Sequence, residues 1–447
     1  MAKTFRGGIH IPESKNTKDC AICEFPSPAV VSIPMQQHIG APATPLVKKG
    51  DAVKAGQVIG RFDSGLSCPV HASVSGVVKD VEMRPSYTGY GKTAYVIIEN
   101  DFKDELSEEV KPYDGDIYKA SAEDVIEKVK EAGISGMGGA AFPTYAKISS
   151  AIGKAKDVII NCAECEPYIT ANHRLMLEEP ETIVNGAKIL KNALNVDSVI
   201  FAVEANKKDA AKVLSKTIGD DKSLKVEILK TKYPQGDERQ LIYALKGVEL
   251  PAGKLPADVG CVIFNAETSS AVYHAMKTGM PLIKRVVTVD GDAVNEPKNI
   301  RVPIGTSYED IFAFCGGIKD NIGRIISGGP MMGNAQWNYD SVVMKNTSAI
   351  LALFEKDEKK PSEGNCIHCG KCVSVCPMHL MPNYLAAFSK VDNKEMCEKF
   401  NILSCVECGC CTYICPGRVP IVQHIRNTKA QINAQRKKMA AAAAEKM

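Results

Sequence analysis

The sequence predicts a multidomain protein of mixed α/β and α+β class, and three observations support this. The chain has 447 residues, which at roughly 100–200 residues per domain is enough for two to four domains. Between residues 157 and 230, buried-strand patterns alternate with helical patterns, as expected for a mostly parallel α/β sheet. More than half of the 17 cysteines fall between Cys366 and Cys415, which indicates a separate metal-binding domain.

The composition excludes several classes of function. A net charge of only +3 gives no case for nucleic-acid binding. The N-terminal segment lacks the basic start, apolar core and cleavage site of a signal peptide. No apolar run reaches the roughly 20 residues that a bilayer-spanning helix needs. We therefore expect a soluble chain that reaches a membrane only through partner proteins.

The first 112 residues predict an arm followed by a small β domain. Residues 1–36 are rich in Pro, Lys and Asn and predict an irregular arm, and residues 37–112 contain short β-runs. The stretches PLVKKGDAVKAGQVIG and HASVSGVVKDVE alternate apolar and polar residues with Gly at the bends. They resemble the two halves of a lipoyl-like barrel-sandwich domain. The hairpin between them, DSGLSCPV, has no carrier lysine, so we expect a structural or docking role.

Residues 113–284 predict an α/β domain. A helix is expected over residues 121–132, because Ser121 can serve as its N-cap and acidic residues follow directly. Further strands are expected at 157–164, 197–204 and 224–230, and further helices at 180–194 and 206–218. Ligands of such parallel sheets bind at the carboxyl ends of the strands.

The remaining elements are expected in three parts. Residues 285–355 predict a small α+β unit with a hairpin, a short helix and a strand that ends in the turn SGGPMMG. A polar linker begins the next domain, which we place at residues 356–419. Residues 420–447 predict a basic helix, with seven Lys or Arg residues and one acid, Glu445, between Arg418 and Lys446. This helix is either a solvated surface or a docking element for an acidic partner.

Two cysteine runs give the most specific chemical signal. CIHCGKCVSVCP and CVECGCCTYICP both have the spacing CxxCxxCxxxCP. A [4Fe–4S] cluster needs four thiolates, and in two-cluster proteins the fourth Cys of each run ligates the other cluster. The runs and the helical segment between them therefore predict a helical di-cluster ferredoxin domain. One cluster is assigned to Cys366, Cys369, Cys372 and Cys415, and the other to Cys405, Cys408, Cys411 and Cys376.

Zinc is the alternative metal. Zinc sites usually pair two CxxC motifs across a gap, whereas here four cysteines share one run with a trailing Pro. Cys397 and Cys410 fall outside the pattern and are expected to be small buried hydrophobic residues. A separate candidate zinc site consists of His10, Cys20, Cys23, Cys68 and His71.

The stretch GISGMGGAAFPT, residues 133–144, matches the dinucleotide pattern G-x-G-x-x-G/A at Gly136, Gly138 and Ala141. A dinucleotide-binding turn requires a strand before the glycines and a helix after them. Here a charged helical pattern precedes the glycines, so this test fails. What remains is a turn of small residues whose backbone N–H groups can approach an anion or a flat ring. A structural turn and a ligand site both fit these residues.

A resemblance distinguishes these two interpretations. GISGMGGAAFPTYAK resembles the flavin-binding glycine loop of the flavoprotein component of respiratory complex I, and NCAECEP, YPQGDERQLI and FNAETSSAV are similar to further motifs of that family. The resemblance implies a complex-I-like α/β domain that binds FMN and NAD(H). It implies that Glu166, as a catalytic-site residue, lies near the nicotinamide or its ribose. The residues implied for FMN are Gly136, Gly138, Gly139, Lys147, Asn161, Glu164, Tyr233, Gly236, Asp237, Glu238 and Asn265.

The order of the domains carries a second resemblance. A lipoyl-like barrel, a complex-I-like flavin domain, a β-grasp (SLBB-like) unit and a di-cluster ferredoxin domain together resemble the RnfC family of the Rnf electron-transport complexes. That family implies hydride exchange between NAD(H) and FMN, followed by single-electron relay through two clusters. It implies membrane subunits and a ferredoxin-like subunit as partners, ferredoxin as an indirect partner, and coupling to Na⁺ or H⁺ translocation. The implied location is the cytoplasmic face of the bacterial cell membrane, as a peripheral protein.

Two other functions are compatible with the same motifs. The chain could be the diaphorase subunit of a soluble flavin-based NADH-linked enzyme. It could also be a scaffold whose ferredoxin domain only relays electrons. The lipoyl-like barrel and the basic C-terminal helix favour the membrane complex over the diaphorase.

Overall fold

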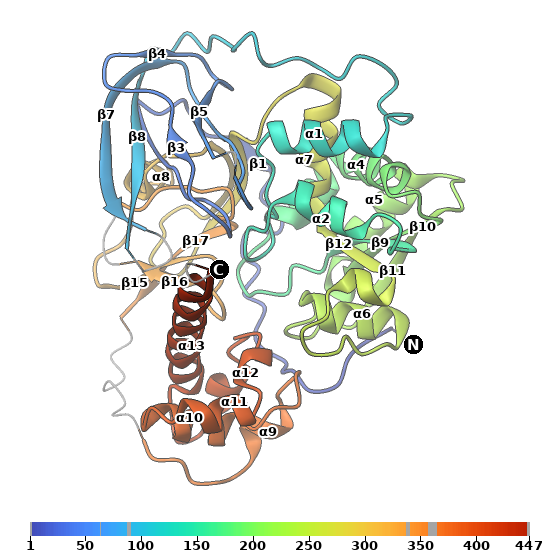
Figure 1. Ribbon diagram of the computed structural model, residues 1–447, viewed down its shortest axis with the longest axis vertical. Helices are drawn as coiled ribbons and strands as arrows, with labels where there is room; N and C mark the ends of the chain where they lie inside the picture. Colours follow the sequence, from blue (N-terminus) through green and yellow to red (C-terminus); the bar gives the residue numbers. More distant parts are fainter. Residues whose placement is uncertain (1, 63, 87–90, 337–339, 356–363, 445–447) are drawn as a thin grey trace.

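The computed structural model describes residues 2–62, 64–86, 91–336, 340–355 and 364–444, with the side chains of residues 440–444 left out. Figure 1 shows the barrel and a six-stranded sheet on one side, an α/β domain on the other, and the cysteine-rich domain below them. Within the described residues, no helix combines the length and the apolar composition that crossing a bilayer requires.

The barrel domain consists of two small antiparallel sheets around a shared apolar core. One sheet has the order β2 (Val30–Pro34), β8 (Lys92–Asn100), β7 (Gly76–Pro85) and β4 (Ala52–Val53). The other has the order β3 (Thr44–Pro45), β5 (Val58–Arg61) and β6 (Val70–His71). Alternate residues such as Val31, Ile33, Val96 and Ile98 point inward and are fully buried. The predicted barrel-sandwich is confirmed, although its first strand lies in the segment for which the sequence predicted an irregular arm.

The α/β domain is built on a four-stranded, entirely parallel sheet. Its order is β11 (Leu224–Leu229), β10 (Ser198–Glu204), β9 (Asp157–Cys162) and β12 (Cys261–Asn265). The helices are α1 (Ala122–Glu131), α2 (Thr144–Ala151), α3 (Ala171–Glu178), α4 (Pro180–Ala193), α5 (Lys208–Ile218), α6 (Glu238–Lys246) and α7 (Ala266–Thr278), with short 3₁₀ turns at Ala205–Lys207 and Pro256–Val259. The strands and helices predicted here are confirmed, including the Ser121 cap of α1, which forms a capping box with Asp124.

The α+β unit forms a six-stranded sheet. Its order is β1 (Ile22–Glu24), β14 (Lys298–Pro303), β13 (Lys284–Asp290), β17 (Ala349–Phe354), β15 (Ile322–Ser327) and β16 (Asn334–Gln336), with α8 (Tyr308–Phe314) packed on it. The turn SGGPMMG follows β15, as predicted. The predicted polar linker covers residues 356–364, and residues 356–363 of it lie outside the described residues.

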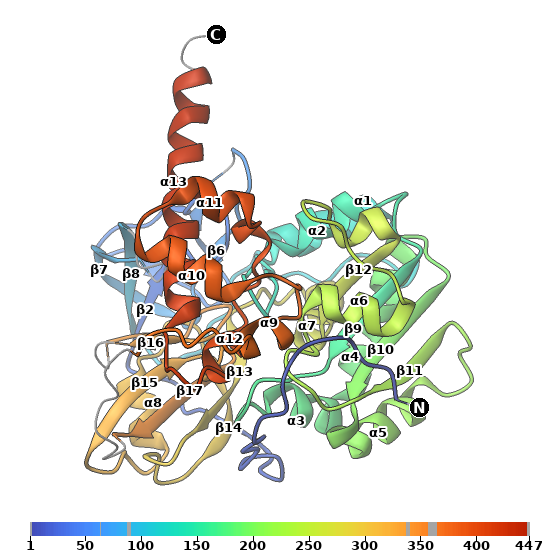
Figure 2. The same cartoon turned by 90° about the horizontal axis from the view of Figure 1, so that it is seen from below.

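The N-terminal arm is more ordered than the sequence predicted. Lys3 pairs with Leu229, the Gly8 amide donates to the Val375 carbonyl, and Ile9 pairs with Tyr233. The arm then adds β1 in parallel to β14 of the six-stranded sheet. Figure 2 shows it as a dark blue trace that passes the α/β domain and the cysteine-rich domain. The expectation of an irregular arm is therefore wrong for β1 and β2, which complete sheets of other domains.

The cysteine-rich domain is helical, as predicted. Its helices are α9 (Lys371–Ser374), α10 (Pro382–Lys390), α11 (Lys394–Lys399), α12 (Cys410–Tyr413) and α13 (Ile421–Ala444), with a 3₁₀ turn at Ile402–Ser404. The first half of α13 is not a solvated surface, because Ile421, Ile425 and Ile432 are buried in the core of this domain. Lys429 and Arg426 of α13 contact Glu407 at 2.6 and 3.0 Å. These two basic residues therefore hold the second cysteine run.

Candidate functional site

The motifs predicted to bind flavin meet at one edge of the parallel sheet. The carboxyl ends of β9, β11 and β12 lead into the acidic loop (residues 163–169), the loop 230–237 and α7. The glycine stretch (residues 133–144) lies against the first turn of α7. This edge is where parallel α/β sheets bind their ligands.

The glycine stretch is held by α7 while its tip is left accessible. The Met137 amide donates to Thr268 Oγ1 at 3.1 Å. A Cβ on Gly138 would lie 2.8 Å from Asn265 Nδ2 and 3.2 Å from Asn265 Cβ, so a side chain here would displace Asn265. Within the described structure, the amides of Gly138, Gly139 and Ala140 are exposed and have no protein acceptor. Free N–H groups on an exposed turn fit a phosphate or a flavin ring.

Polar side chains from three elements, α2, β9 and α6, form hydrogen bonds at this edge of the sheet. Lys147 Nζ donates to Glu238 Oε1 at 2.5 Å and to the Ile263 carbonyl at 3.1 Å. Asn161 Nδ2 donates to the Gly236 carbonyl at 2.8 Å, which joins the loops after β9 and β11. The fold therefore brings together two pairs of the residues predicted for FMN, Lys147 with Glu238 and Asn161 with Gly236.

Asp237 begins α6. Its carboxylate accepts from the amides of Arg239 and Gln240. Burial raises the pKa of Asp237 above its ordinary value. The carboxylate of this predicted FMN residue is thus already used as a helix cap.

Both acids of the acidic loop use their carboxylates within the chain. Glu164 accepts from the amides of Asn172 and His173 at the start of α3, at 2.7 and 3.1 Å. Glu166 accepts from the Met332 and Met331 amides, at 2.9 and 3.1 Å, in the turn after β15. Burial raises the pKa of Glu166 to about 7. The structure thus places Glu166 between the acidic loop and the six-stranded sheet.

The barrel domain is joined to the start of the glycine stretch by Lys345. Lys345, which is buried to 1% exposure, donates from Nζ to the carbonyls of Pro69 and Gly133, both at 2.7 Å. Pro69 belongs to the hairpin that lacks a carrier lysine, and Cys68 Sγ of the same hairpin lies 3.8 Å from the Ile134 carbonyl. Burial lowers the pKa of Lys345 to about 8. The docking role predicted for the barrel is consistent with these contacts.

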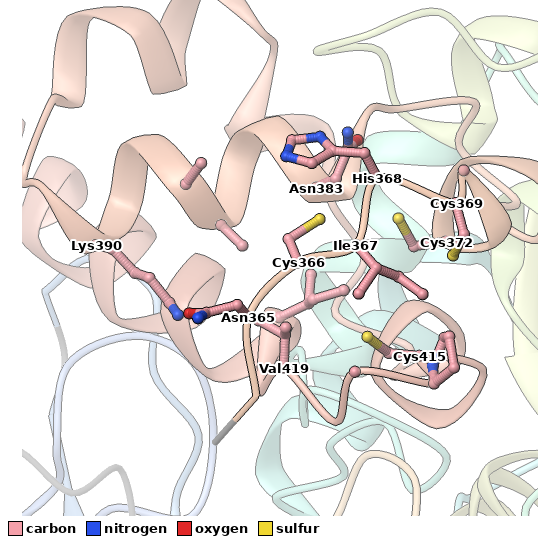
Figure 3. Close-up of a pocket in the computed structure, with 16 residues that line it drawn as sticks. Asn365, Cys366, Ile367, His368, Cys369, Cys372, Asn383, Lys390, Cys415 and Val419 are labelled. Atoms are coloured by element: carbon pink, nitrogen blue, oxygen red, sulfur yellow. The ribbon is translucent and has the colours of Figure 1, made fainter. Parts of the chain in front are cut away.

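Four cysteines line a cavity of about 320 Å³ in the cysteine-rich domain. They are Cys366, Cys369, Cys372 and Cys415. Figure 3 shows their sulfur atoms around the cavity, with Cys415 arriving from the second run. Cys366 and Cys369 are exposed. This outer cavity therefore opens at the surface of the described domain.

A second, smaller cavity is lined by Cys376, Cys405, Cys408 and Cys411, together with the non-motif residue Cys410. The two cavities divide the eight motif cysteines into the two groups that crossed ligation predicts. This inner cavity adjoins the loop of residues 230–237, because Tyr233 Oη donates to the Cys408 carbonyl at 2.8 Å. Gln240 of α6 also donates to the Pro377 carbonyl at 3.2 Å.

The donor set of these cavities fits iron–sulfur clusters. Within the described residues, no three His, Cys, Asp or Glu side chains converge closely enough to hold a single metal ion. A cubane cluster is wider than one ion, so its four thiolates stand further apart than the ligands of zinc. The same finding is against the candidate zinc site at His10, Cys20, Cys23, Cys68 and His71, which the structure does not assemble. Ligation of clusters by the eight cysteines remains a prediction.

Sequence reasoning missed three residues that hold the site, namely Thr268, Lys345 and Lys15. Thr268 stands inside the motif FNAETSSAV, so its contact with the glycine stretch had a signal in the sequence. Lys345 and Lys15 had none, because each is a lone lysine in an unremarkable segment and contacts loops more than 140 residues away. Such contacts depend on how the domains pack and leave no local pattern.

Three family models match separate parts of the chain. A Nuo51 FMN-binding domain matches residues 129–274, an RnfC barrel sandwich hybrid domain matches residues 3–103, and an SLBB domain matches residues 286–335. These matches agree with the barrel, the α/β domain and the β-grasp-like unit described above. The chain therefore contains an FMN-binding domain of the Nuo51 type.

Relatives match nearly the whole chain. The C subunit of the Na⁺-translocating ferredoxin:NAD⁺ oxidoreductase complex of Acetobacterium woodii is 46% identical over 97% of this chain and 98% of that protein. The proton-translocating counterpart of Clostridium ljungdahlii is also 46% identical, over 97% and 95%. The C subunit of the ion-translocating oxidoreductase complex of Rhodobacter capsulatus is 39% identical over 96% and 83%. The chain therefore belongs to the RnfC family, the C subunits of the ion-translocating oxidoreductase complexes.

Proposed function

We propose that this electron-transfer protein is the NAD(H)-facing component of a membrane-bound ferredoxin:NAD oxidoreductase. It exchanges hydride between NAD(H) and FMN and relays single electrons through two [4Fe–4S] clusters. The contact that carries the proposal is the 2.8 Å hydrogen bond from Tyr233, in a flavin-loop motif, to the carbonyl of Cys408, in a cluster motif. The relatives are named as ferredoxin:NAD⁺ oxidoreductase subunits, which supports the same assignment.

The residues of the chain would hold three groups. The exposed amides of Gly138 and Gly139, with Lys147 and Asn161, would bind FMN. The cysteines of the inner and outer cavities would each hold one cluster. When bound, FMN takes up two electrons as a hydride and releases them one at a time, and each cluster carries one electron.

The arrangement of the cavities supports an order for the relay. Tyr233 and Gln240 place the inner cavity beside the loop of residues 230–237 and α6. Packed side chains including Ile9 and Cys165 fill the space around Tyr233. The outer cavity carries the exposed Cys366 and Cys369. We therefore propose that the inner cysteines exchange electrons with the flavin side and the outer cysteines with a partner protein.

Reconstitution tests this function directly. The full-length chain, loaded with FMN, iron and sulfide, should show a flavin spectrum that NADH bleaches, and it should reduce an artificial acceptor with NADH. Removing FMN should abolish NADH oxidation while the iron content stays. A loaded chain that binds FMN and iron but does not oxidise NADH would instead support the relay-only scaffold.

The partners and the location are also proposed. The family name supports assembly with the other Rnf subunits, and a position on the cytoplasmic face of the membrane would give access to NADH. The alternative is the diaphorase component of a soluble NADH-linked enzyme, which shares the flavin and cluster motifs. The match of the barrel model to residues 3–103 favours the Rnf assignment.

A further inference from the structure

One lysine of the N-terminal arm is bound inside the acidic loop of the α/β domain. Lys15 Nζ donates to the carbonyls of Glu164, Glu166 and Ile169, at 2.8, 2.8 and 2.6 Å. An ammonium group has three donors, and this one directs all three at a single loop. The three carbonyls span the whole turn that leads from β9 to α3.

The neighbours of Lys15 anchor the arm on both sides of this contact. The Tyr168 amide donates to the Glu13 carbonyl at 2.9 Å. Asn16 Nδ2 donates to Asp290 of β13 at 3.1 Å. Thr17 and Thr170 share a buried hydrogen bond of 2.5 Å between their hydroxyl groups. Residues 13–17 of the arm thus contact both the acidic loop and the six-stranded sheet, and these contacts hold Lys15 against the loop.

The acidic loop needs such support because its backbone is strained. Glu164 and Tyr168 have φ angles of +45° and +69°. Non-glycine residues in this region cost on the order of 1–3 kcal/mol each and persist only where the surroundings fix them. Hydrogen bonds from a charged donor are stronger than neutral ones. The ammonium of Lys15 is therefore suited to hold the loop in this shape.

Lys15 stays charged at neutral pH in spite of its surroundings. Burial lowers the pKa of Lys15 to about 8, with the nearby Lys207 adding to the effect and Glu164 and Glu204 opposing it. Glu204 and Lys207 form their own ion pair at 3.5 Å. The carboxylates of Glu164 and Glu166 point instead to α3 and to the turn after β15. The loop carbonyls are therefore the direct partners of Lys15.

We propose that Lys15 is a positioning residue for NAD(H), because it fixes the acidic loop that carries Glu164 and Glu166. This inference rests on the proposed function and on the predicted position of Glu166, in the acidic loop, near the nicotinamide or its ribose. In the proposed function, FMN would be held by the glycine stretch, Lys147 and Asn161, which Lys15 does not contact. The carboxylate of Glu164, the predicted FMN residue of the acidic loop, is used by the amides at the start of α3. Loss of the ammonium should therefore weaken NADH binding while FMN binding and the chemical step are retained.

The test compares Lys15→Met with Lys18→Met in the full-length chain loaded with FMN and clusters. Lys18 is in the same arm, but its side chain is exposed, so it controls for loss of charge. Lys15→Met removes all three hydrogen bonds to the acidic loop. It should raise the KM for NADH about tenfold, which corresponds to about 1.4 kcal/mol of binding free energy. The kcat with an artificial acceptor and the FMN occupancy should stay close to wild type. Lys18→Met should change none of these values.

Hydrogen exchange gives a readout that does not depend on activity. The amides of Tyr168, Asn172 and His173 should exchange faster in Lys15→Met than in the wild type or in Lys18→Met, because all three are protected by contacts of the arm or of the acidic loop. An unchanged KM for NADH in Lys15→Met overturns the role assigned to Lys15, whether or not the FMN occupancy and kcat fall. A wild-type chain that binds FMN but does not oxidise NADH contradicts the proposed function instead, and the two failures are thus distinguishable.

Discussion

Two adjacent glycines of the glycine stretch differ in what surrounds them. A Cβ on Gly138 would meet the Asn265 side chain at 2.8 Å, whereas within 4 Å of a Cβ on Gly139 there is no other atom of the described chain. A side chain at position 138 therefore strains the folded protein itself. A side chain at position 139 enters open space, which the proposed flavin would fill.

This difference predicts distinct effects of two substitutions. Gly139→Val should lower FMN occupancy while the thermal midpoint of the FMN-free chain stays that of the wild type. Gly138→Val should lower both, with NADH oxidation lost only as a consequence. Flavin absorbance per chain and thermal unfolding of the FMN-free protein measure the two effects. Full FMN occupancy in both variants would show that this stretch is not the flavin loop.

Glu166 should make stability depend on pH. Its pKa of about 7 lies above the ordinary 4.5 because of burial, so between these values the folded state holds more protons than the unfolded state. Stability therefore falls as pH rises through this window, by on the order of 3 kcal/mol for the complete shift. Glu166→Gln, which cannot ionise, should lose this dependence.

The measurement is the thermal midpoint of the loaded, anaerobic protein at about pH 5 and about pH 7.5, which bracket the titration. At the upper pH, the thermal midpoint of Glu166→Gln should exceed that of the wild type by more than it does at the lower pH. Glu249→Gln, at an exposed acid, is the matched control. If the thermal midpoints of Glu166→Gln and Glu249→Gln shift equally between the two pH values, Glu166 titrates as an ordinary surface acid.

Individual site residues were best predicted from the sequence where a short motif is typical of a single kind of ligand. The cysteine spacing divided eight residues into two groups that the cavities reproduce, and the glycine and Asn motifs met at one edge of the sheet. The position of Glu166 could not be predicted, because its partners are backbone amides of a turn 165 residues away. The same limit applies to Lys15, whose partners are three carbonyls.

At the scale of elements, the two cysteine runs are a structural repeat. His368 and Gly370 have φ angles of +55° and +73°, and the equivalent Glu407 and Gly409 have +57° and +80°. In each run a four-residue helix follows, α9 in the first and α12 in the second. Equal spacing of the cysteines in the sequence is thus matched by similar φ angles at two equivalent positions and by a short helix after each. The repeat could therefore be recognised in the sequence, whereas the ligation of clusters stays a prediction.

Crossed ligation gives a prediction in terms of iron content. Each single Cys→Ala change at a ligand should lower the iron from about eight to about four atoms per chain, because one cubane is lost. The double variant Cys376→Ala with Cys408→Ala should also retain about four, since both belong to one cluster. Cys376→Ala with Cys366→Ala should retain almost none, although these two cysteines lie in the same run.

Iron analysis and the cluster signal in electron paramagnetic resonance measure these contents. Cys397→Ala is the control, because this buried cysteine lies outside both cavities. If Cys376→Ala with Cys366→Ala keeps half of the iron, each run holds its own cluster and the crossed assignment is wrong.

Elements that depend on distant partners were the ones the sequence missed. The strand β1 has three residues, too few for a period-2 pattern to identify it, and it exists because β14 offers a parallel edge. The basic face of α13 suggested solvent or a partner protein. In the structure, Arg426 and Lys429 instead contact Glu407 within the same domain.

At the scale of the whole molecule, the proposed assembly predicts where the protein is found. In cells that contain the complete complex, the chain should sediment with the membranes. In a strain that lacks the membrane subunits, it should move to the soluble fraction while keeping its FMN and iron. Immunoblots of the two fractions check this, with a soluble dehydrogenase as the marker. A chain that is wholly soluble in the complete strain would favour the diaphorase alternative.

The long-range contacts of the N-terminal arm also determine when it can fold relative to the other domains. Asn16 finds its partner Asp290 274 residues later in the chain, and Gly8 finds Val375 later still. During translation the arm therefore leaves the ribosome long before the residues that hold it exist. Contacts this far apart form slowly, and domains that emerge early tend to fold first as units. We expect the arm to be synthesised first and seated last, so that Lys15 enters the acidic loop only when the other domains are complete.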